Sequence, residues 1–373
     1  MKNLIGAALA LSLACGGHAS ESPPPPSHDK VTPTGSASGS ATGSATTPTM
    51  APAGSAAGYS SSTLALPGGG SAGIGMDYLL FDPHTQSVWV PAGNSGAVDV
   101  IDAKTNHVDS IAGFATKEMD RNGKKRVVGP SSAALGDGVV YVGNRGDSSV
   151  CAIDEAKHAK GACATLDSMP DGILVVPQTN EVWVTTPRDK SIRILDGKTL
   201  AQKAKLTFDG DPEGFAVDST RDRFYTNLED KDATLAIDVK SRKTVATWKP
   251  DCGEDGPHGL RLDAASGFLF IACSTKVETM DVAHDGALVG SADTGDGVDD
   301  LDFAAATHRL YVGAAKAATL SVIDVDAKGQ LRVAAVVPTR AGARNGVVDA
   351  TGKVFLSHSK GSELVVVTPP ATP

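Results

Sequence analysis

The chain has 373 residues, of which 41% are hydrophobic and only 5% aromatic, and its formal net charge is −9 at pH 7. This balance argues against a nucleic-acid partner, because binding to phosphates depends on clustered Lys and Arg. Length alone would favour two or three domains, but an internal repeat favours one large domain that follows a long leader.

Residues 1–15 have the features of an export signal. Lys2 supplies the positive start, and the apolar run 4–14 is too short to span a bilayer comfortably. Cys15 and the two glycines after it resemble a bacterial lipoprotein signal, in which the Cys is lipidated and becomes the mature N-terminus. That family usually has Leu where this chain has Ser12, and Ser12 with Ala14 also fits ordinary signal-peptide cleavage.

Residues 16–61 consist almost wholly of Ser, Gly, Ala, Thr and Pro. Such a segment cannot bury enough apolar surface to fold, so we expect a disordered tether. A tether of this length would hold the following domain away from a membrane surface.

An apolar residue followed by Asp recurs at nearly constant spacing. The pairs are Ile101-Asp102, Ile153-Asp154, Leu195-Asp196, Ile237-Asp238, Met280-Asp281 and Ile323-Asp324. Their intervals are 52, 42, 42, 43 and 43 residues, with several short strand patterns in each. A period in the low forties predicts an all-β, seven-bladed β-propeller over residues 62–369, with a tail at 370–373.

The seventh unit, 345–367, contains only three strand patterns. Segment 62–66 resembles the fourth strands of the other units, and we expect it to complete the last blade. The alternative is that 62–66 belongs to the tether.

The first interval holds about ten extra residues, at 115–127, where 120–123 could turn a small hairpin. Propeller geometry places this insert on the face where the first strands begin. It is either a lid or a tolerated surface insertion.

Four cysteines remain if Cys15 carries lipid, and an even number in an exported chain indicates disulfides. Cys151 and Cys163 flank one predicted hairpin, and Cys252 and Cys273 fall on the same face of another unit, so we expect these two pairs. Four inert thiols are the alternative. A zinc site is less favoured, since no Cys-x-x-Cys pair occurs.

A polar residue precedes the first strand of every unit, and in a propeller this strand lines the central channel. The seven residues are Asp77, Ser131, Asp171, Glu213, His258, Asp299 and Asn345, with Asp300 and Arg344 beside them. We therefore predict a ligand-binding ring at one mouth of the channel. A water-filled polar channel is the alternative, because turns favour polar residues in any case.

Carboxylate and amide oxygens suit a hard divalent cation such as Ca²⁺. The predicted metal ligands are Asp171, Glu213, Asp299 and Asn345, and adding His258 would allow a transition metal. A metal at this mouth could polarise an ester carbonyl and activate water.

The units VWVPAGNSGAVDVIDAKTNHV (88–108), VYVGNRGDSSVCAIDEAKH (140–158) and LYVGAAKAATLSVIDVDAKG (310–329) resemble YVTN-type repeats of the YncE-like family of exported bacterial propellers. The resemblance implies seven blades and a place outside the cytoplasm. Gluconolactonase-like propellers are similar in pattern and hold a divalent metal with Glu, Asn and Asp; here Glu213, Asn345 and either Asp299 or Asp171 would serve, although those enzymes have six blades.

These features predict an exported propeller tethered to a membrane by lipid, either periplasmic or at the outer membrane or cell surface. We expect a monomer that binds an unknown ligand or a cell-envelope protein through its channel face, without catalysis. The alternative is a metal-dependent lactonase or related hydrolase. A redox partner is a weaker idea, since no Cys-x-x-Cys-His for haem attachment is present.

Overall fold

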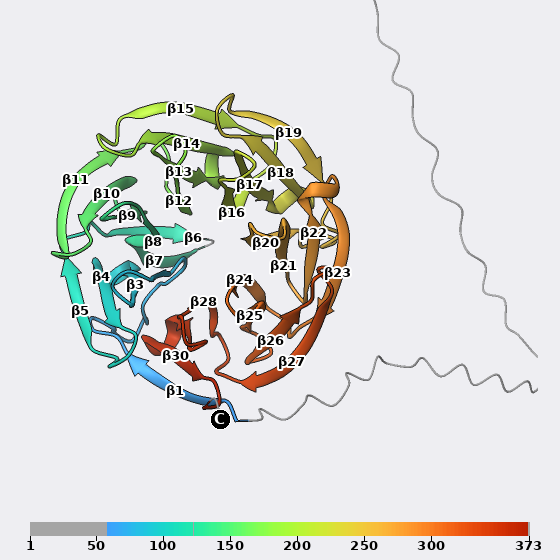
Figure 1. Cartoon of the computed structure of the whole chain (residues 1–373). Helices are drawn as coiled ribbons and strands as arrows, with labels where there is room; N and C mark the ends of the chain where they lie inside the picture. The colour runs from blue at the N-terminus through green and yellow to red at the C-terminus, as the bar shows by residue number, and fades with distance from the viewer. Residues whose placement is uncertain (1–57, 122, 372–373) are drawn as a thin grey trace, which may run out of the picture. The chain divides into compact units, whose positions relative to one another are not determined.

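The computed structural model describes residues 58–121 and 123–371. The predicted signal, with Cys15, and nearly all of the predicted tether lie outside the described residues. Across the described part the strands form seven four-stranded antiparallel sheets, the blades, arranged in a ring around a central channel (Figure 1). The seven-bladed, all-β prediction is confirmed. No helix in the described part is both long and apolar enough to cross a membrane.

Each blade begins with an inner strand at the channel and continues outward. The first four blades are β2 (Leu80–Asp82), β3 (Ser87–Ala92), β4 (Ala97–Asp102) and β5 (Val108–Ala112); β8 (Pro130–Leu135), β9 (Val139–Asn144), β10 (Ser149–Asp154) and β11 (Ala159–Thr165); β12 (Ile173–Val176), β13 (Glu181–Thr186), β14 (Ser191–Asp196) and β15 (Gln202–Thr207); and β16 (Pro212–Asp218), β17 (Arg223–Leu228), β18 (Ala233–Asp238) and β19 (Lys243–Trp248).

The last three blades repeat this order, and the seventh takes its outer strand from the start of the domain. They are β20 (Pro257–Asp263), β21 (Phe268–Cys273), β22 (Lys276–Asp281) and β23 (Ala287–Asp293); β24 (Val298–Ala304), β25 (Arg309–Ala314), β26 (Thr319–Val325) and β27 (Leu331–Pro338); and β28 (Arg344–Val348), β29 (Val354–His358), β30 (Glu363–Thr368) and β1 (Ser60–Ala65).

The second and third strands of each blade are apolar because neighbouring blades cover both of their faces. Trp89 of β3, for example, is fully buried and packs with Val140 and Val142 of β9 in the next blade. Trp183 of β13 is buried in the same way against the fourth blade. Six residues of β3 and six of β13 are all buried, which explains why these strands show apolar runs rather than strict alternation.

The repeated Asp closes the turn after the third strand, as its position predicts. Asp102 Oδ1 accepts hydrogen bonds from the backbone N–H groups of Lys104 and Thr105, and Asp196 does the same for Lys198 and Thr199. These are the short local bonds by which Asp stabilises tight turns.

Asp324 is the exception among these residues. It lies 2.8 Å from Arg309 Nε and also pairs with Arg332. Its strand, β26, continues to Val325, so Asp326 caps the turn instead.

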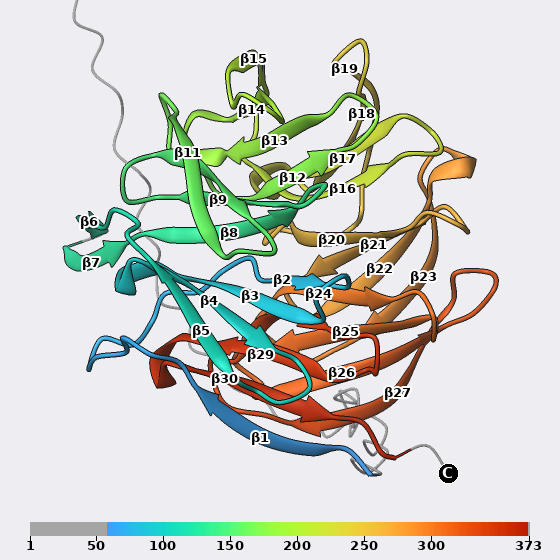
Figure 2. The same cartoon turned by 60° about the vertical axis from the view of Figure 1, so that its left-hand side comes forward.

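The two ends of the domain meet in the seventh blade. Strand β1 pairs antiparallel with β30 from Ser60↔Thr368 to Ala65↔Glu363. Figures 1 and 2 show β1 at the outer rim, with β30 beside it on the inner side. The closure prediction is confirmed, although the strand begins at Ser60 rather than at residue 62. Leu66 ends the pairing, because its buried side chain turns into the core between the first and last blades.

The insert forms a hairpin of two strands, β6 (Lys117–Arg121) and β7 (Lys124–Val128), paired from Lys117↔Val128 to Arg121↔Lys124. Figure 1 shows β6 directed toward the centre of the ring, and Figure 2 shows the hairpin beyond the start of β8. Both predicted disulfides are present: Cys151–Cys163 joins β10 to β11, and Cys252–Cys273 joins the loop before β20 to the end of β21.

Candidate functional site

The polar ring lies where the inner strands begin, and β-bulges turn several of its side chains toward the channel. The pairing of five inner strands skips a register at this point, between Pro130 and Ser132 in β8, for example. The skipped residues include Ser131, His258, Asp299 and Asn345. A bulge leaves one residue outside the ladder and redirects its side chain, and bulges are common beside functional sites.

A cavity of about 490 Å³ opens at this mouth of the channel. Its wall contains seven carboxylates and four arginines. The carboxylates are Asp77, Asp120, Asp171, Asp211, Glu213, Glu229 and Asp299, and the arginines are Arg126, Arg145, Arg188 and Arg344. Acidic side chains therefore outnumber arginines at the site, and the arginines come from several parts of the ring.

The hairpin forms part of the cavity wall. Met119, Asp120, Arg126 and Val128 all line the cavity. The sequence left two alternatives for this insert, a lid or a tolerated surface insertion. The hairpin covers one side of the mouth, which is where a lid would lie.

Arg145 is the central positive charge of the mouth. Its Nη2 atom lies 2.6 Å from Asp77 Oδ2 and also pairs with Asp171 Oδ1. The Arg145 side chain is only 15% exposed, so it neutralises two carboxylates that come from different blades. Sequence reasoning noted the turn Asn144-Arg145-Gly146 but assigned it no role. The position of Arg145 could have indicated a role at the mouth. In each blade the turn between the second and third strands lies on the face where the inner strands begin.

Asn345 and Arg344 hold Asp299 from opposite sides. The amide nitrogen of Asn345 donates to Asp299 Oδ2 at 2.6 Å and to Asp77 Oδ1 at 3.1 Å. Arg344 Nη1 lies 3.0 Å from Asp299 Oδ1. The amide oxygen of Asn345 is buried without a hydrogen-bond partner among the described residues.

Glu213, His258 and Asp299 form a compact group of possible metal ligands. Each offers one donor atom, and these atoms all lie within 4.8 Å of one another. His258 Nε2 contacts Ser274 Oγ at 3.2 Å, and Nδ1 lies 3.1 Å from Glu229 Oε1. Glu229 begins the short turn Glu229–Lys231 after β17, and the ring pattern gave no reason to single it out.

This group differs from the predicted metal set. Glu213 and Asp299 belong to both, and Asn345 contacts Asp299, but the carboxylate of Asp171 is engaged by Arg145. His258 replaces it. Two carboxylates and an imidazole fit a divalent cation, and the imidazole favours a transition metal over Ca²⁺.

The buried acids at the mouth have raised pKa values. Burial raises the pKa of Glu213 well above its ordinary value, and the charges of Asp171 and Glu229 raise it further. Burial also raises the pKa of Asp171 against the opposing charge of Arg145, and that of Asp299 against Arg344. Clustered carboxyls with raised pKa values are frequent at functional sites.

The contact with Glu229 favours the protonated form of His258. Burial alone would lower the pKa of His258, but the adjacent Glu229 raises it above the ordinary value. The same contact lowers the pKa of Glu229. The contact between His258 and Glu229 therefore resembles a salt bridge. The neighbouring Glu213 has the higher pKa of the two glutamates.

Four of the predicted site residues do not line the main cavity: Ser131, His258, Asp300 and Asn345. Ser131 lies at a separate hollow of about 20 Å³, where its buried hydroxyl has no partner among the described residues. Asp300 is buried and pairs with Arg261 of β20 at 3.0 Å. Both Asp299 and Asp300 fall in the bulge of β24, and the pairing with Arg261 keeps Asp300 away from the cavity that Asp299 lines.

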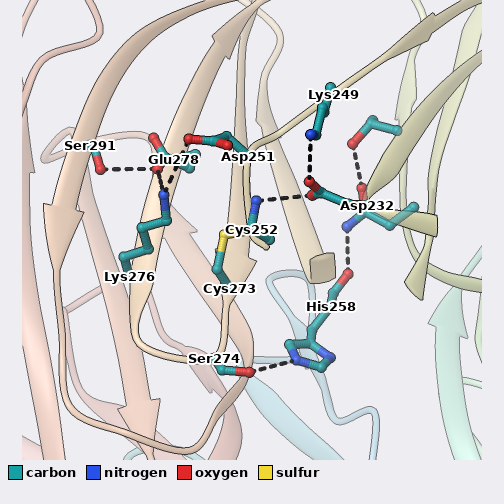
Figure 3. The surroundings of a disulfide bond; sticks show 12 residues. Asp232, Lys249, Asp251, Cys252, His258, Cys273, Ser274, Lys276, Glu278 and Ser291 are labelled. Atoms are coloured by element: carbon teal, nitrogen blue, oxygen red, sulfur yellow. Dashed lines mark hydrogen bonds and ion pairs between the residues drawn. A yellow bond between two sulfur atoms is a disulfide. The ribbon is translucent and has the colours of Figure 1, made fainter. Parts of the chain in front are cut away.

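The Cys252–Cys273 disulfide anchors the loop that leads into β20, the strand that bears His258 (Figure 3). Cys252 N donates to Asp232 Oδ1 at 2.9 Å, which fixes the loop to the fourth blade. Cys273 directly precedes Ser274, whose hydroxyl contacts the His258 ring. The disulfide thus holds both the strand that bears His258 and the residue that orients it.

Comparison with solved structures shows the fold. A chain of the mitotic checkpoint complex has a TM-score of 0.67 and 15% identity, over 83% of this chain and 91% of that one. Hydrazine synthase from Kuenenia stuttgartiensis has a TM-score of 0.64 and 13% identity, over 83% and 98%. Selenomethionine-substituted virginiamycin B lyase from Staphylococcus aureus has a TM-score of 0.65 and 13% identity, over 83% and 99%.

At this level of identity the three structures support a shared propeller architecture and leave the activity open. No protein-family model matches the chain, and no curated protein matches its sequence. The fold and the site define a seven-bladed β-propeller with a charged cavity at one mouth of its channel. The likeness to YncE-like proteins stays a prediction.

Proposed function

We propose that this chain is an exported ligand-binding propeller of the YncE-like kind that takes a small, positively charged group into the cavity at its channel mouth. The observation that carries the proposal is the cavity itself, about 490 Å³ with seven carboxylates against four arginines. Cavities of roughly 300–1,000 Å³ are typical of small-molecule sites. The group belongs either to a free small molecule or to a cell-envelope component presented at the mouth.

Its cellular setting follows from the disulfides and the leader. Disulfides form and persist in oxidising, exported environments, and the structure contains two. The leader adds the proposed lipid on Cys15 and a tether, which would hold the propeller at a membrane surface as a monomer. A lipid anchor and a tether present a binding face without requiring catalysis.

The distribution of charge gives this proposal a direct test. Spermidine, citrate and glucose serve as cationic, anionic and neutral probes, with binding to the purified protein measured by calorimetry in EDTA. We expect spermidine to bind and the combined variant Asp171→Asn, Glu213→Gln and Asp299→Asn, at three carboxyls of the cavity wall, to lose at least tenfold in affinity. The exposed Asp109 on the outer strand β5 supplies the control variant Asp109→Asn, which should bind as the wild type does.

Two outcomes would count against the proposal. One is binding of citrate but not of spermidine. The other is spermidine binding that the combined variant leaves unchanged while circular dichroism shows an intact fold.

A metal-dependent lactonase is the second candidate, favoured by the three donors of Glu213, His258 and Asp299. A bound divalent ion would supply Lewis-acid activation of an ester carbonyl. Glu229 lies in the cavity wall beside His258 and could accept a proton from the activated water. A sugar-lactone panel with Mn²⁺, Zn²⁺ or Ca²⁺ tests this candidate, and absence of turnover with every ion would exclude it.

A further inference from the structure

We propose that Glu213, His258 and Asp299 bind a divalent transition-metal ion such as Zn²⁺, with Asn345 as a fourth donor. This inference deepens the proposed function, on which it rests, because it names an inorganic cation as one occupant of the acidic mouth. It also replaces the oxygen-only ligand set, which would favour Ca²⁺.

The distances between the donors are close to those a metal requires. Imidazole nitrogens and carboxylate oxygens bind zinc at about 2.0–2.2 Å, so two ligands of one ion lie at most about 4.4 Å apart. The three donor atoms of Glu213, His258 and Asp299 already lie within 4.8 Å of one another. Small side-chain rotations would therefore bring all three into contact with one ion.

Asn345 supplies an independent sign that a ligand is expected here. The residue is only 2% exposed, and its Oδ1 atom has no hydrogen-bond partner within the described chain. A buried, unpaired amide oxygen is costly. The same amide contacts Asp299 through its nitrogen, and turning it over would exchange the two atoms. A cation beside Asp299 would favour the oxygen in that position and satisfy it.

The surroundings of His258 resemble those of a metal-binding imidazole. Ligating histidines commonly use their second ring nitrogen to hydrogen-bond a neighbour, which fixes the orientation of the ring. His258 Nε2 contacts Ser274 Oγ at 3.2 Å, which leaves Nδ1 as the donor. Nδ1 has no well-directed hydrogen bond among the described residues, although Glu229 lies 3.1 Å away.

Two contacts must open for the metal to bind: that of His258 Nδ1 with Glu229 Oε1, at 3.1 Å, and the ion pair of Arg344 with Asp299. Arg344 lies 3.0 Å from Asp299 Oδ1. Its side chain is 44% exposed, so Arg344 can withdraw into solvent, where its guanidinium stays hydrated. The remaining sides of the ion would face the cavity, which leaves room for water or a ligand group.

A second group, Asp82, His84 and Glu155, meets the same distance criterion but is a weaker candidate. Asp82 already accepts hydrogen bonds from the backbone of His84 and the hydroxyl of Thr85. His84 is 64% exposed. These contacts account for the group as a capped surface turn.

The test is zinc binding to the disulfide-intact protein after dialysis against EDTA, measured by calorimetry with ZnCl₂, MnCl₂ and CaCl₂. We expect one Zn²⁺ per chain, weaker Ca²⁺, and at least a tenfold loss of zinc affinity in His258→Gln. The matched controls His107→Gln, at an exposed position, and His84→Gln, in the second group, should bind zinc as the wild type does.

A measurement that needs no variant keeps the test valid if His258→Gln misfolds. Co²⁺ added to the wild type should give the visible absorption bands of an ion with low coordination number, and Zn²⁺ should abolish them. Absence of a stoichiometric site, or a loss of binding in His84→Gln alone, would overturn the inference. If zinc fails while spermidine still binds in EDTA, only the metal inference fails; if neither binds, the proposed function fails as well.

Discussion

Arg145 holds two acids of the channel mouth in place, since Asp77 and Asp171 reach the same guanidinium from different blades. All three side chains are at least 79% buried, so removing the cation would leave two unpaired carboxylates in a shielded site. We expect Arg145→Met to lower the free energy of unfolding by about 3–5 kcal/mol, measured by urea denaturation.

The control for this prediction is Arg188→Met. Arg188 is exposed at the same cavity, and its substitution should change the free energy of unfolding by no more than about 0.5 kcal/mol. Equal effects of the two variants would show that Arg145 is not the structural counter-charge of the mouth.

The buried acids also predict an unusual dependence of stability on pH. Burial raises the pKa of Asp300 to about 6 against the opposing charge of Arg261, whereas an unfolded Asp titrates near about 4. A group whose pKa is higher in the folded than in the unfolded state stabilises the folded protein. This contribution is complete at pH values below the unfolded pKa and is lost as pH rises through the folded pKa. Glu213 and His258, both with raised pKa values, act in the same direction.

We therefore expect the free energy of unfolding in EDTA to fall between pH 5 and pH 8, by about 1.4 kcal/mol from Asp300 alone. Asp218, whose pKa is lowered by Thr220 and Arg221 despite its burial, titrates below this range. Urea denaturation at a series of pH values measures the trend. Stability that rises from pH 5 to pH 8 would contradict the assigned burial of these acids.

Single residues show where sequence reasoning stops. The repeat places Glu213, His258 and Asp299 at equivalent positions of consecutive blades, so their meeting at one mouth could be predicted. The partners Arg145 and Glu229 lie in turns of other strands, and a period says nothing about how far their side chains reach. The pairing of Asp300 with Arg261 depends on the bulge in β24, which the alignment of inner-strand starts could not predict.

The two disulfides are similar elements with different expected consequences. They close loops with sequence separations of 12 and 21 residues, and each should stabilise by about 3 kcal/mol. Only Cys252–Cys273 adjoins the loop of His258 and the hydroxyl of Ser274. We expect Cys252→Ser with Cys273→Ser to weaken zinc binding at least tenfold, whereas Cys151→Ser with Cys163→Ser should lower only the melting temperature.

Calorimetric zinc titration of both double variants, at a temperature where circular dichroism shows each one folded, makes this comparison. Equal zinc affinities in the two variants would mean that the disulfide does not position His258.

The hairpin β6–β7 shows a limit of prediction from sequence. Its turn could be predicted, but its place over the cavity depends on contacts with another blade.

For the molecule as a whole, the pairing of β1 with β30 closes the ring. We expect prolines at Ser62 and Thr63 to break this pairing, expose the edge of β30, and lower the melting temperature while promoting association between chains. The matched control places prolines at Ala246 and Thr247 of β19, an outer strand that stays tied to its neighbour by a short turn. Light scattering and thermal unfolding of both variants provide the measurement.

Association of the β19 variant to the same extent would indicate that β1 acts as an ordinary edge strand. The number of blades itself was predictable, since six apolar-Asp pairs at five intervals, with a seventh unit of three strands after them, indicate a ring of seven sheets. The occupant of the mouth was not, because structures at 13–15% identity share this ring while the mouth depends on individual side chains.

The most direct measurement is a crystal structure of the protein grown with one equivalent of Zn²⁺, with anomalous data collected at the zinc absorption edge. The account predicts a single strong peak between the side chains of Glu213, His258 and Asp299, with Arg344 turned away from Asp299. A peak at Asp82, His84 and Glu155 alone, or an acidic mouth without zinc, would contradict it.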